Sequence, residues 1–314
     1  MYALFYILGY LAFFGFVCLA IIRTRTYLKD SPLHIRWELY PIPHEGPKRA
    51  SYGGSYMEET DWWTKKRHVD HWMDIKAMAE EIFLLKATYE HNQPLWLRTY
   101  PFHMGLYMLM GGTILLNFIV ILELLGVPVH NGFMIFLGNI INAIVPFGAA
   151  CIAGGAIALI IFRMSESGLK KYSAMEQWLN LYSFACFGLL TLCAWVFNPS
   201  YYEVARNFLY NIYTANFRPL GSTWFVLNML AGYFVLIWIP VTNMRHLIMK
   251  YWLYHDIRWG DEATVWSRKN QETIPELLKY DTTWDAPHIS EEGKNKNWAD
   301  VATSNPATDP QASK

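Results

Sequence analysis

The sequence predicts an all-α integral membrane protein built as a bundle of about five transmembrane helices, and three observations support this class. The chain has 314 residues, of which 53% are hydrophobic and 17% are aromatic. The apolar residues gather in five runs, and a membrane-spanning helix needs about 20 mostly apolar residues. Charged residues lie almost entirely between the runs. Length alone would suggest two soluble domains, but these runs are too long for soluble core helices.

The five predicted spans follow the runs in order. They cover residues 3–22, 103–125, 136–162, 178–197 and 223–246. The first run ends at Arg23 without a small-residue cleavage site, so we interpret it as a retained anchor and not as a removed signal peptide. The third run holds small residues from Gly148 to Ala156, which would let a helix or a flat cofactor approach closely.

Basic residues predict the orientation of the spans. The long polar segment 23–102 is rich in lysine and arginine, whereas the connection 126–132 contains neither. Basic residues return between the third and fourth spans, become sparse in 198–222, and are frequent again after the fifth span. Cytoplasmic connections carry the excess of lysine and arginine. We therefore expect the N-terminus outside, and the C-terminus and the large segment 23–102 in the cytoplasm.

The chain is expected to divide into a membrane domain, 1–262, and a cytoplasmic tail, 263–314. The tail has few large apolar residues after Ser290, which predicts partial disorder. Within the cytoplasmic segment, Asp70–Glu90 has apolar residues at helical spacing. This helix is expected to lie on the membrane surface, to dock a partner, or to pack on the surrounding loop. The formal net charge is zero, and no nucleic-acid partner is predicted.

Two histidines stand at span ends on the same predicted side of the membrane. His103 begins the second span, and His246 lies just past the apolar part of the fifth. A histidine at a helix end is either an ordinary interfacial side chain or a ligand. Two of them at one depth suit the two faces of a haem iron, and Arg98 and Arg245 could pair with the haem propionates. The sequence therefore predicts one b-type haem held by His103 and His246.

Glu123 is a carboxylate inside the second apolar run. A charge within a membrane is costly, and it is usually paired or functional. Because Glu123 lies about one turn from the predicted outer surface, its side chain could also simply reach water. If functional, it would accept a proton from a quinol oxidised near the outer face.

The arrangement of spans and histidines resembles the gamma subunit of respiratory nitrate reductase. Polar motifs resemble one branch, the membrane cytochrome b subunits of the tetrahaem cytochrome membrane complex and the sulfite-reductase-linked complex of sulfate reducers. The motifs are LHIRWELYPIPHEG (33–46), YGGSYMEETDWW (52–63), RTYPFH (98–103), PVTNMRH (240–246) and YHDIRWGDE (254–262). The resemblance covers about residues 1–262.

This resemblance implies a multi-pass subunit of a quinone-linked oxidoreductase complex of anaerobic respiration, in the cytoplasmic (inner) membrane. Through b haem it would exchange electrons between menaquinone, or another quinone, and a cytoplasmic iron–sulfur subunit. In such complexes that partner resembles the catalytic subunit of heterodisulfide reductase, and a periplasmic multihaem cytochrome c is a further expected partner. By position, His103 and His246 match the ligands of the cytoplasmic-side haem.

One departure from the family concerns a second, outer haem, which takes a further ligand from each of the same two helices. The corresponding stretches here, MGGTILLN (110–117) and WFVLNMLAG (224–232), contain no histidine. The residues therefore favour one haem, where the resemblance alone would imply two. With a single haem, three arrangements are possible for the quinone. The quinone site lies close to the haem, a partner subunit supplies an intermediate electron carrier, or the quinone binds deep between the helices. The first requires the fewest additional components.

Two other classes of function remain open at this point. A haem-free membrane anchor that docks soluble redox subunits would explain the large cytoplasmic segment and its tryptophans. A small-solute transporter fits less well, because the spans lack paired ionisable residues and the chain shows no inverted repeat.

Overall fold

A computed structural model describes most of the chain. The described residues are 2–29, 48, 59–65, 70–198, 200–249, 267–284, 286, 289–291 and 294–305. The chain forms two units, Met1–Arg23 with Ile75–Ile248, and Thr24–Asp74 with Met249–Lys314. The motifs at 33–46 and 254–262, and most of the motif at 52–63, lie outside the described residues.

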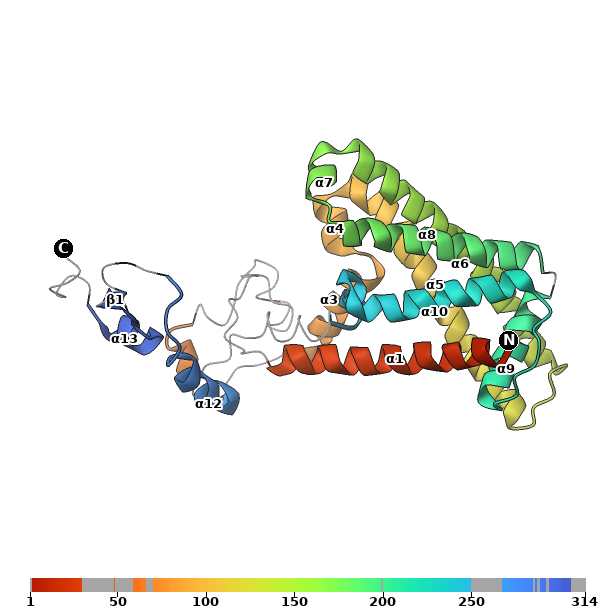
Figure 1. The fold of residues 1–314 in the computed structure, drawn as a ribbon, viewed down its shortest axis with the longest axis horizontal. Coiled ribbons are helices and arrows are strands. Elements are labelled where there is room, and N and C mark those ends of the chain that lie inside the picture. The colour runs from red at the N-terminus through yellow and green to blue at the C-terminus, as the bar shows by residue number, and fades with distance from the viewer. Residues whose placement is uncertain are drawn as a thin grey trace. The chain divides into compact units, whose positions relative to one another are not determined.

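The first unit is a helical bundle (Figure 1). Its long helices are α1 (Tyr2–Lys29), α5 (Gln93–Leu124), α6 (Gly132–Ser165), α8 (Met175–Val196) and α10 (Thr223–Val241). Within the described residues, these five are long and apolar enough to cross a membrane. The predicted class, an all-helical bundle with about five spans, is therefore confirmed, and the chain is a multi-pass membrane protein.

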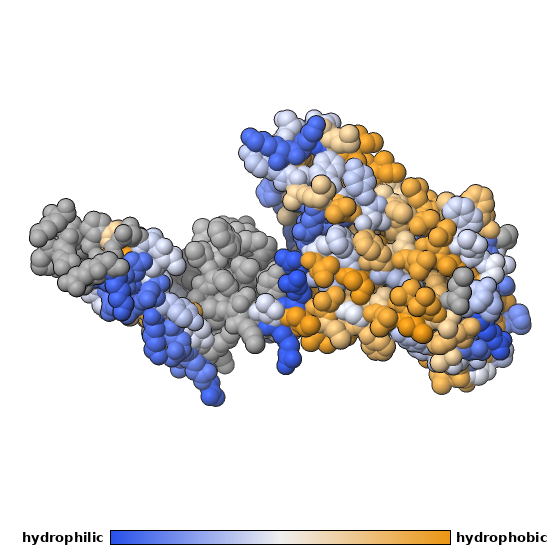
Figure 2. All heavy atoms as spheres, in the orientation of Figure 1, coloured by the Kyte–Doolittle hydropathy of each residue, from blue (hydrophilic) through white to orange (hydrophobic). Residues whose placement is uncertain are grey.

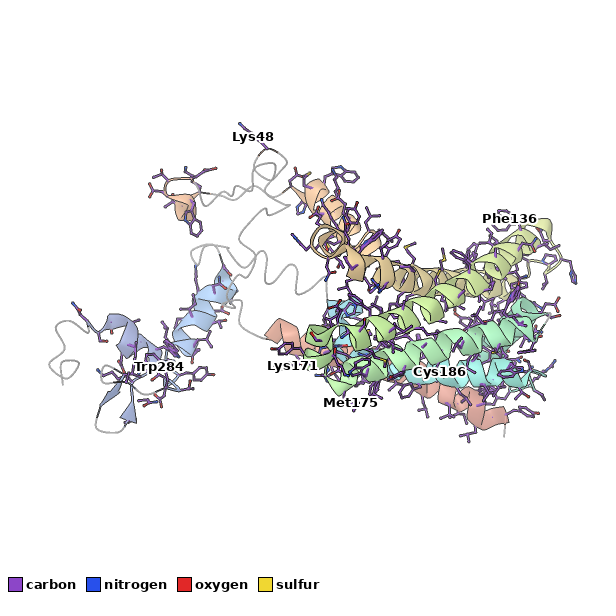
Figure 3. All side chains as sticks on the ribbon, turned by 90° about the horizontal axis from the view of Figure 1, so that it is seen from above. Lys48, Phe136, Lys171, Met175, Cys186 and Trp284 are labelled. Carbon is purple, nitrogen blue, oxygen red and sulfur yellow. The ribbon has the colours of Figure 1, made fainter. Side chains whose placement is uncertain are left out.

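The outer surface of the bundle is apolar. Leu11 of α1, Ile114 of α5 and Ile161 of α6 are each more than half exposed, and Figure 2 shows hydrophobic side chains over the long helices. A soluble monomer rarely exposes so continuous an apolar surface. Lipid is the environment that this surface matches. Figure 3 labels Met175, which begins α8 at one end of the bundle, and Phe136 near the other end.

Several span boundaries differ from the predicted ones, and two of them bear on the histidines. Helix α5 begins at Gln93, ten residues before the predicted start, because the Asn92 side chain accepts a hydrogen bond from the Leu95 N–H and caps the helix. Pro94 in the first turn suits a helix start. Helix α10 ends at Val241 and not at residue 246, and the short 3₁₀ helix η4 (Asn243–Arg245) follows it.

The predicted helix Asp70–Glu90 is present as two helices, α3 (His71–Phe83) and α4 (Lys86–His91). Leu85 separates them with a left-handed backbone, φ 50°. The hydroxyl of Tyr107 on α5 donates to the carbonyl of Ile82 at 2.7 Å. The C-terminal end of α3 is therefore tied to α5 at Tyr107.

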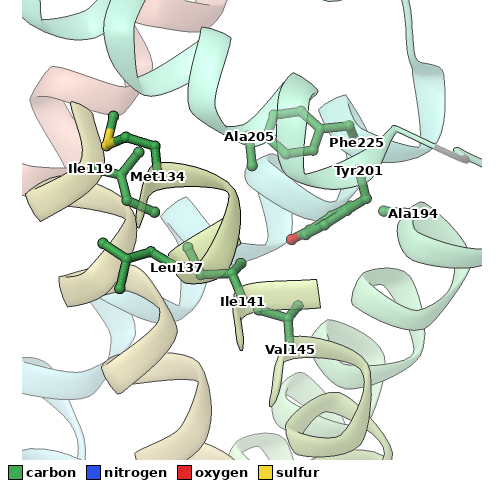
Figure 4. Close-up of a cluster of buried hydrophobic side chains, with 9 residues drawn as sticks. All are labelled: Ile119, Met134, Leu137, Ile141, Val145, Ala194, Tyr201, Ala205 and Phe225. Carbon is green, nitrogen blue, oxygen red and sulfur yellow. The ribbon is translucent and has the colours of Figure 1, made fainter. Parts of the chain in front are cut away.

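Two shorter helices lie in connections of the bundle, α7 (Ser167–Tyr172) and α9 (Tyr201–Tyr213). No helix was predicted in 198–222, so α9 is an omission of the sequence analysis. Its buried side chains join those of α5, α6, α8 and α10 in one apolar core (Figure 4). The members of this core are Ile119, Met134, Leu137, Ile141, Val145, Ala194, Tyr201, Ala205 and Phe225.

Helices α5 and α6 approach closely because glycines face each other. A Cβ on Gly105 would lie 2.5 Å from the carbonyl oxygen of Gly148, and a Cβ on Gly155 would lie 2.7 Å from the Cβ of Phe102. The small residues that the sequence analysis noted on α6 therefore serve helix packing. Phe102 is 3% exposed, and this burial fixes the rotation of α5 just before His103.

The described part of the second unit contains short elements. They are η3 (Trp62–Thr64), α12 (Arg268–Leu277), α13 (Trp298–Thr303) and an antiparallel pair of strands, β1 (Ser290–Glu291) and β2 (Lys294–Asn295). Ile289 is fully buried, and its carbonyl accepts a hydrogen bond from the Lys296 N–H at 2.8 Å. The composition predicted partial disorder for the tail, 263–314, and it gave no signal for these elements. Residues 306–314 lie outside the described part.

Candidate functional site

His103 and His246 lie together at one end of the bundle. His103 is on α5, and His246 directly follows η4. Their ring centroids are 6.4 Å apart, and their ring planes are inclined by 48°. This is the end of the bundle that the charge distribution predicts to be cytoplasmic.

His103 is oriented by its own helix and by neighbouring rings. Its Nδ1 lies 2.8 Å from the carbonyl oxygen of Thr99, one turn earlier. The adjacent Phe102 packs edge-on against Phe184 of α8, with ring centroids 5.4 Å apart. Since Phe102 is buried between α6 and α8, the next residue is turned toward a different side of α5, where it meets His246.

His246 is oriented by the break after α10. Thr242 has an extended backbone, with φ −106° and ψ −178°, and its side chain caps η4. Thr242 therefore ends α10 and begins η4, which packs against α10 and α8 and is directly followed by His246. The Nδ1 of His246 lies 2.9 Å from the carbonyl oxygen of Asn243.

These two hydrogen bonds favour the same tautomer in both rings. A carbonyl oxygen only accepts, so each bond requires Nδ1 to be the donor, although the Thr99 hydroxyl, 3.2 Å from Nδ1 of His103, can donate to it or accept from it. In the neutral imidazole the lone pair is then on Nε2, the nitrogen that can bind a metal. Histidine ligands in proteins usually donate their other N–H to a backbone carbonyl or a carboxylate. Both residues carry this arrangement.

The spacing of the rings fits a bis-histidine haem. A metal–imidazole bond is about 2.0 Å long and a ring centre lies about 1.2 Å from its nitrogen, so ligands on opposite faces of one metal have centroids roughly 6.4 Å apart. Among the described residues, no three His, Cys, Asp or Glu side chains form a possible metal site. The protein side chains described at this end of the bundle thus offer one pair of imidazoles.

The two predicted propionate partners have different surroundings. The Arg98 guanidinium lies 4.3 Å from the centre of the Phe162 ring on α6, and its Nη1 donates to the carbonyl of Pro94. The Arg245 guanidinium donates to the carbonyl of Thr242 at 3.3 Å. Arg245 is thus next to His246 in the turn that orients it, whereas Arg98 is engaged with α6.

Glu123 lies at the opposite end of α5 and is paired. Its Oε2 accepts a hydrogen bond from Nη1 of Arg206 on α9 at 2.7 Å, and the two side chains are 18% and 13% exposed. Glu123 also lines a cavity of about 830 Å³ together with Tyr210, Asn211 and Arg218. Twenty residues separate His103 from Glu123, which is about 30 Å along a helix. The structure therefore does not bring Glu123 to the histidine pair.

Beside the histidines lies a cluster of polar residues that was not predicted from the sequence. Asn180 of α8 is 1% exposed. Its Nδ2 donates to Oδ1 of Asn243 at 2.6 Å, and its Oδ1 accepts from Nε1 of Trp238 at 2.6 Å. A polar residue within an apolar run was the available signal, but nothing in the sequence pairs Asn180 with Asn243.

Comparisons with known proteins give no match: no family model, no curated protein and no solved structure matches the chain. The helices and the site define a multi-pass helical membrane protein with two neighbouring histidines at one end of its bundle.

Proposed function

We propose that the chain is the haem b membrane subunit of a multi-subunit respiratory complex in the cytoplasmic membrane. It exchanges electrons between membrane quinone, such as menaquinone, and a cytoplasmic iron–sulfur subunit. The observation that carries the proposal is the neighbouring pair His103 and His246, with 6.4 Å between ring centroids. Bound haem would supply a one-electron carrier at this end of the bundle. The two histidines would hold its iron through Nε2.

Arg245 is the better candidate for a propionate partner. It lies beside His246 in the turn after α10, and a guanidinium suits a carboxylate in geometry and charge. Arg98 would have to leave the ring of Phe162 to make the same contact. Arg245 would then hold a propionate near η4, on the predicted cytoplasmic side, where the iron–sulfur partner would receive or deliver electrons.

The quinone site belongs beside the haem in this proposal. The cavity at Glu123 is about 30 Å of helix away from His103, too far for direct electron transfer to a single haem. Glu123 is also held by Arg206, so accepting a proton would disrupt this ion pair. A partner subunit resembling the heterodisulfide reductase catalytic subunit, and a periplasmic multihaem cytochrome c, complete the proposed complex and share its catalysis.

Haem content of purified variants tests the proposal. His103→Ala and His246→Ala should each lose the b-type band of the reduced-minus-oxidised spectrum, because each removes one of two axial ligands. His130→Ala is the matched control, since His130 lies in the connection between α5 and α6 at the other end of the bundle. Normal haem content in both ligand variants would contradict the proposal. A wild-type protein without haem that still binds soluble redox subunits would favour the haem-free anchor.

A further inference from the structure

The backbone carbonyl that orients His246 is that of Asn243, and two residues of α8 form hydrogen bonds with Asn243. The side chain of Asn243 accepts a hydrogen bond from Asn180 at 2.6 Å. Its backbone N–H donates to the carboxylate of Glu176, at the start of α8. Its carbonyl oxygen, in turn, lies 2.9 Å from Nδ1 of His246. The position of Asn243 therefore depends on α8, and the plane of the His246 ring depends on Asn243.

The orientation of the Asn180 amide is determined by its neighbours. The indole Nε1 of Trp238 can only donate, so the oxygen of Asn180 must face Trp238, at 2.6 Å. The amide nitrogen is then directed at Oδ1 of Asn243. Both ends of the amide are thus used, as expected for a polar group that is 1% exposed. Losing either partner would leave a buried polar atom unpaired, which is unfavourable, so the hydrogen-bonded series Trp238–Asn180–Asn243 holds its geometry.

We infer that Asn180 is a positioning residue for the proposed haem: acting through Asn243, it fixes the plane of the His246 imidazole relative to that of His103. The inference rests on the proposed function. His103 takes its orientation from α5 through Thr99, whereas His246 takes its orientation from α8 through Asn180. The 48° between the two ring planes is therefore a property of how α8 packs against α5 and α10.

The angle between axial imidazole planes has a direct spectroscopic consequence. In a low-spin ferric haem it sets the separation of the iron d orbitals that the imidazoles contact, and so the largest g value of the electron paramagnetic resonance spectrum. Parallel planes give a smaller value and strongly twisted planes a larger one. A change in protein stability alone does not move this value in the haem that remains bound, so it distinguishes positioning from general support of the fold.

Two variants break the hydrogen bond between Asn180 and Asn243, one at each partner. Asn180→Leu removes the buried amide at similar volume. Asn243→Ala removes only the side chain that Asn180 contacts, keeps the carbonyl that orients His246, and lies at an exposed position, so it tests the inference even where Asn180→Leu fails to fold. Asn228→Leu is the matched control. Asn228 is also 1% exposed, but it pairs with Thr191 at 2.8 Å and not with the turn that holds His246.

The experiment records the ferric spectrum and haem retention of the purified protein and its variants. Asn180→Leu and Asn243→Ala should shift the largest g value in the same direction, and the double variant should show no further shift because both break one link. Haem affinity should fall by at most roughly 10-fold, the low end of the effect of losing a direct partner of a histidine ligand, because the Asn243 carbonyl remains. Asn228→Leu should keep the wild-type g value.

Two results would overturn the inference alone: a wild-type g value in both variants that bind haem, or an equal shift in Asn228→Leu. A wild-type protein that binds no haem would instead overturn the proposed function, and this inference with it. The two failures are therefore distinguishable in one set of samples.

Discussion

At the scale of single residues, the structure places the two histidines together and Glu123 apart from them. His103 and His246 meet, each with Nδ1 on a carbonyl of its own helix or turn. Glu123 is at the other end of α5 and pairs with Arg206. A carboxylate in an apolar run was predicted to be paired or functional, and in the structure Glu123 forms an ion pair with Arg206.

The ion pair between Glu123 and Arg206 should contribute to stability. Glu123→Gln leaves the guanidinium of Arg206 with a neutral partner in a largely buried position, and hydrogen bonds to charged groups contribute about 1.5–3 kcal/mol. The thermal midpoint of the protein in detergent should therefore fall, while haem content stays at the wild-type level. Haem loss equal to that of His103→Ala would contradict the separation of Glu123 from the site.

At the scale of helices, hydropathy predicted the spans well, because lipid requires long apolar segments whose backbone is satisfied internally. It predicted helix ends poorly. Helix α5 begins ten residues outside the apolar run, where Asn92 and Pro94 form a cap that local sequence could have revealed. Helix α9 was also detectable, since Tyr201, Ala205, Phe208 and Ile212 recur at helical spacing.

Only part of the site could be predicted from the sequence, and the reason is physical. The charge rule places helix ends on one side of the membrane, which was sufficient to bring His103 and His246 to one depth. The link between Asn180 and Asn243 joins residues 63 positions apart, and it depends on how α8 rotates against α10. Such a rotation comes from packing, and no local pattern encodes it.

The close contact between α5 and α6 gives a prediction at this scale. A Cβ at Gly155 would meet the backbone nitrogen of Phe102 at 2.8 Å, whereas a Cβ at Gly154 meets nothing within 4 Å. Gly155→Ala should therefore destabilise the protein by about 1–3 kcal/mol through overpacking, and should weaken haem retention because Phe102 precedes His103.

Gly154→Ala is the matched control, and it should be neutral or slightly stabilising because alanine favours a helix over glycine. Thermal unfolding in detergent measures both variants. Equal midpoints for Gly154→Ala and Gly155→Ala would show that the two helices are not in close contact at Gly155.

At the scale of the whole molecule, orientation connects the site to its proposed partner. The basic segments predict that the histidine end of the bundle faces the cytoplasm. A fluorescent protein fused after residue 314 should therefore fold and fluoresce in a bacterial host, and alkaline phosphatase fused there should be inactive. The reverse pattern would place the histidine pair on the outer side, and would exclude a cytoplasmic iron–sulfur partner at that end.

The haem-to-protein ratio of the purified chain tests the central claim most directly. One neighbouring histidine pair, and no histidine in residues 110–117 or 224–232, predict one b haem for each polypeptide. A pyridine haemochrome assay combined with quantitative amino-acid analysis measures this ratio. A value near one agrees with a single site at His103 and His246. A value of zero would contradict the account, and a value of two would require an outer haem with ligands other than histidines in those stretches.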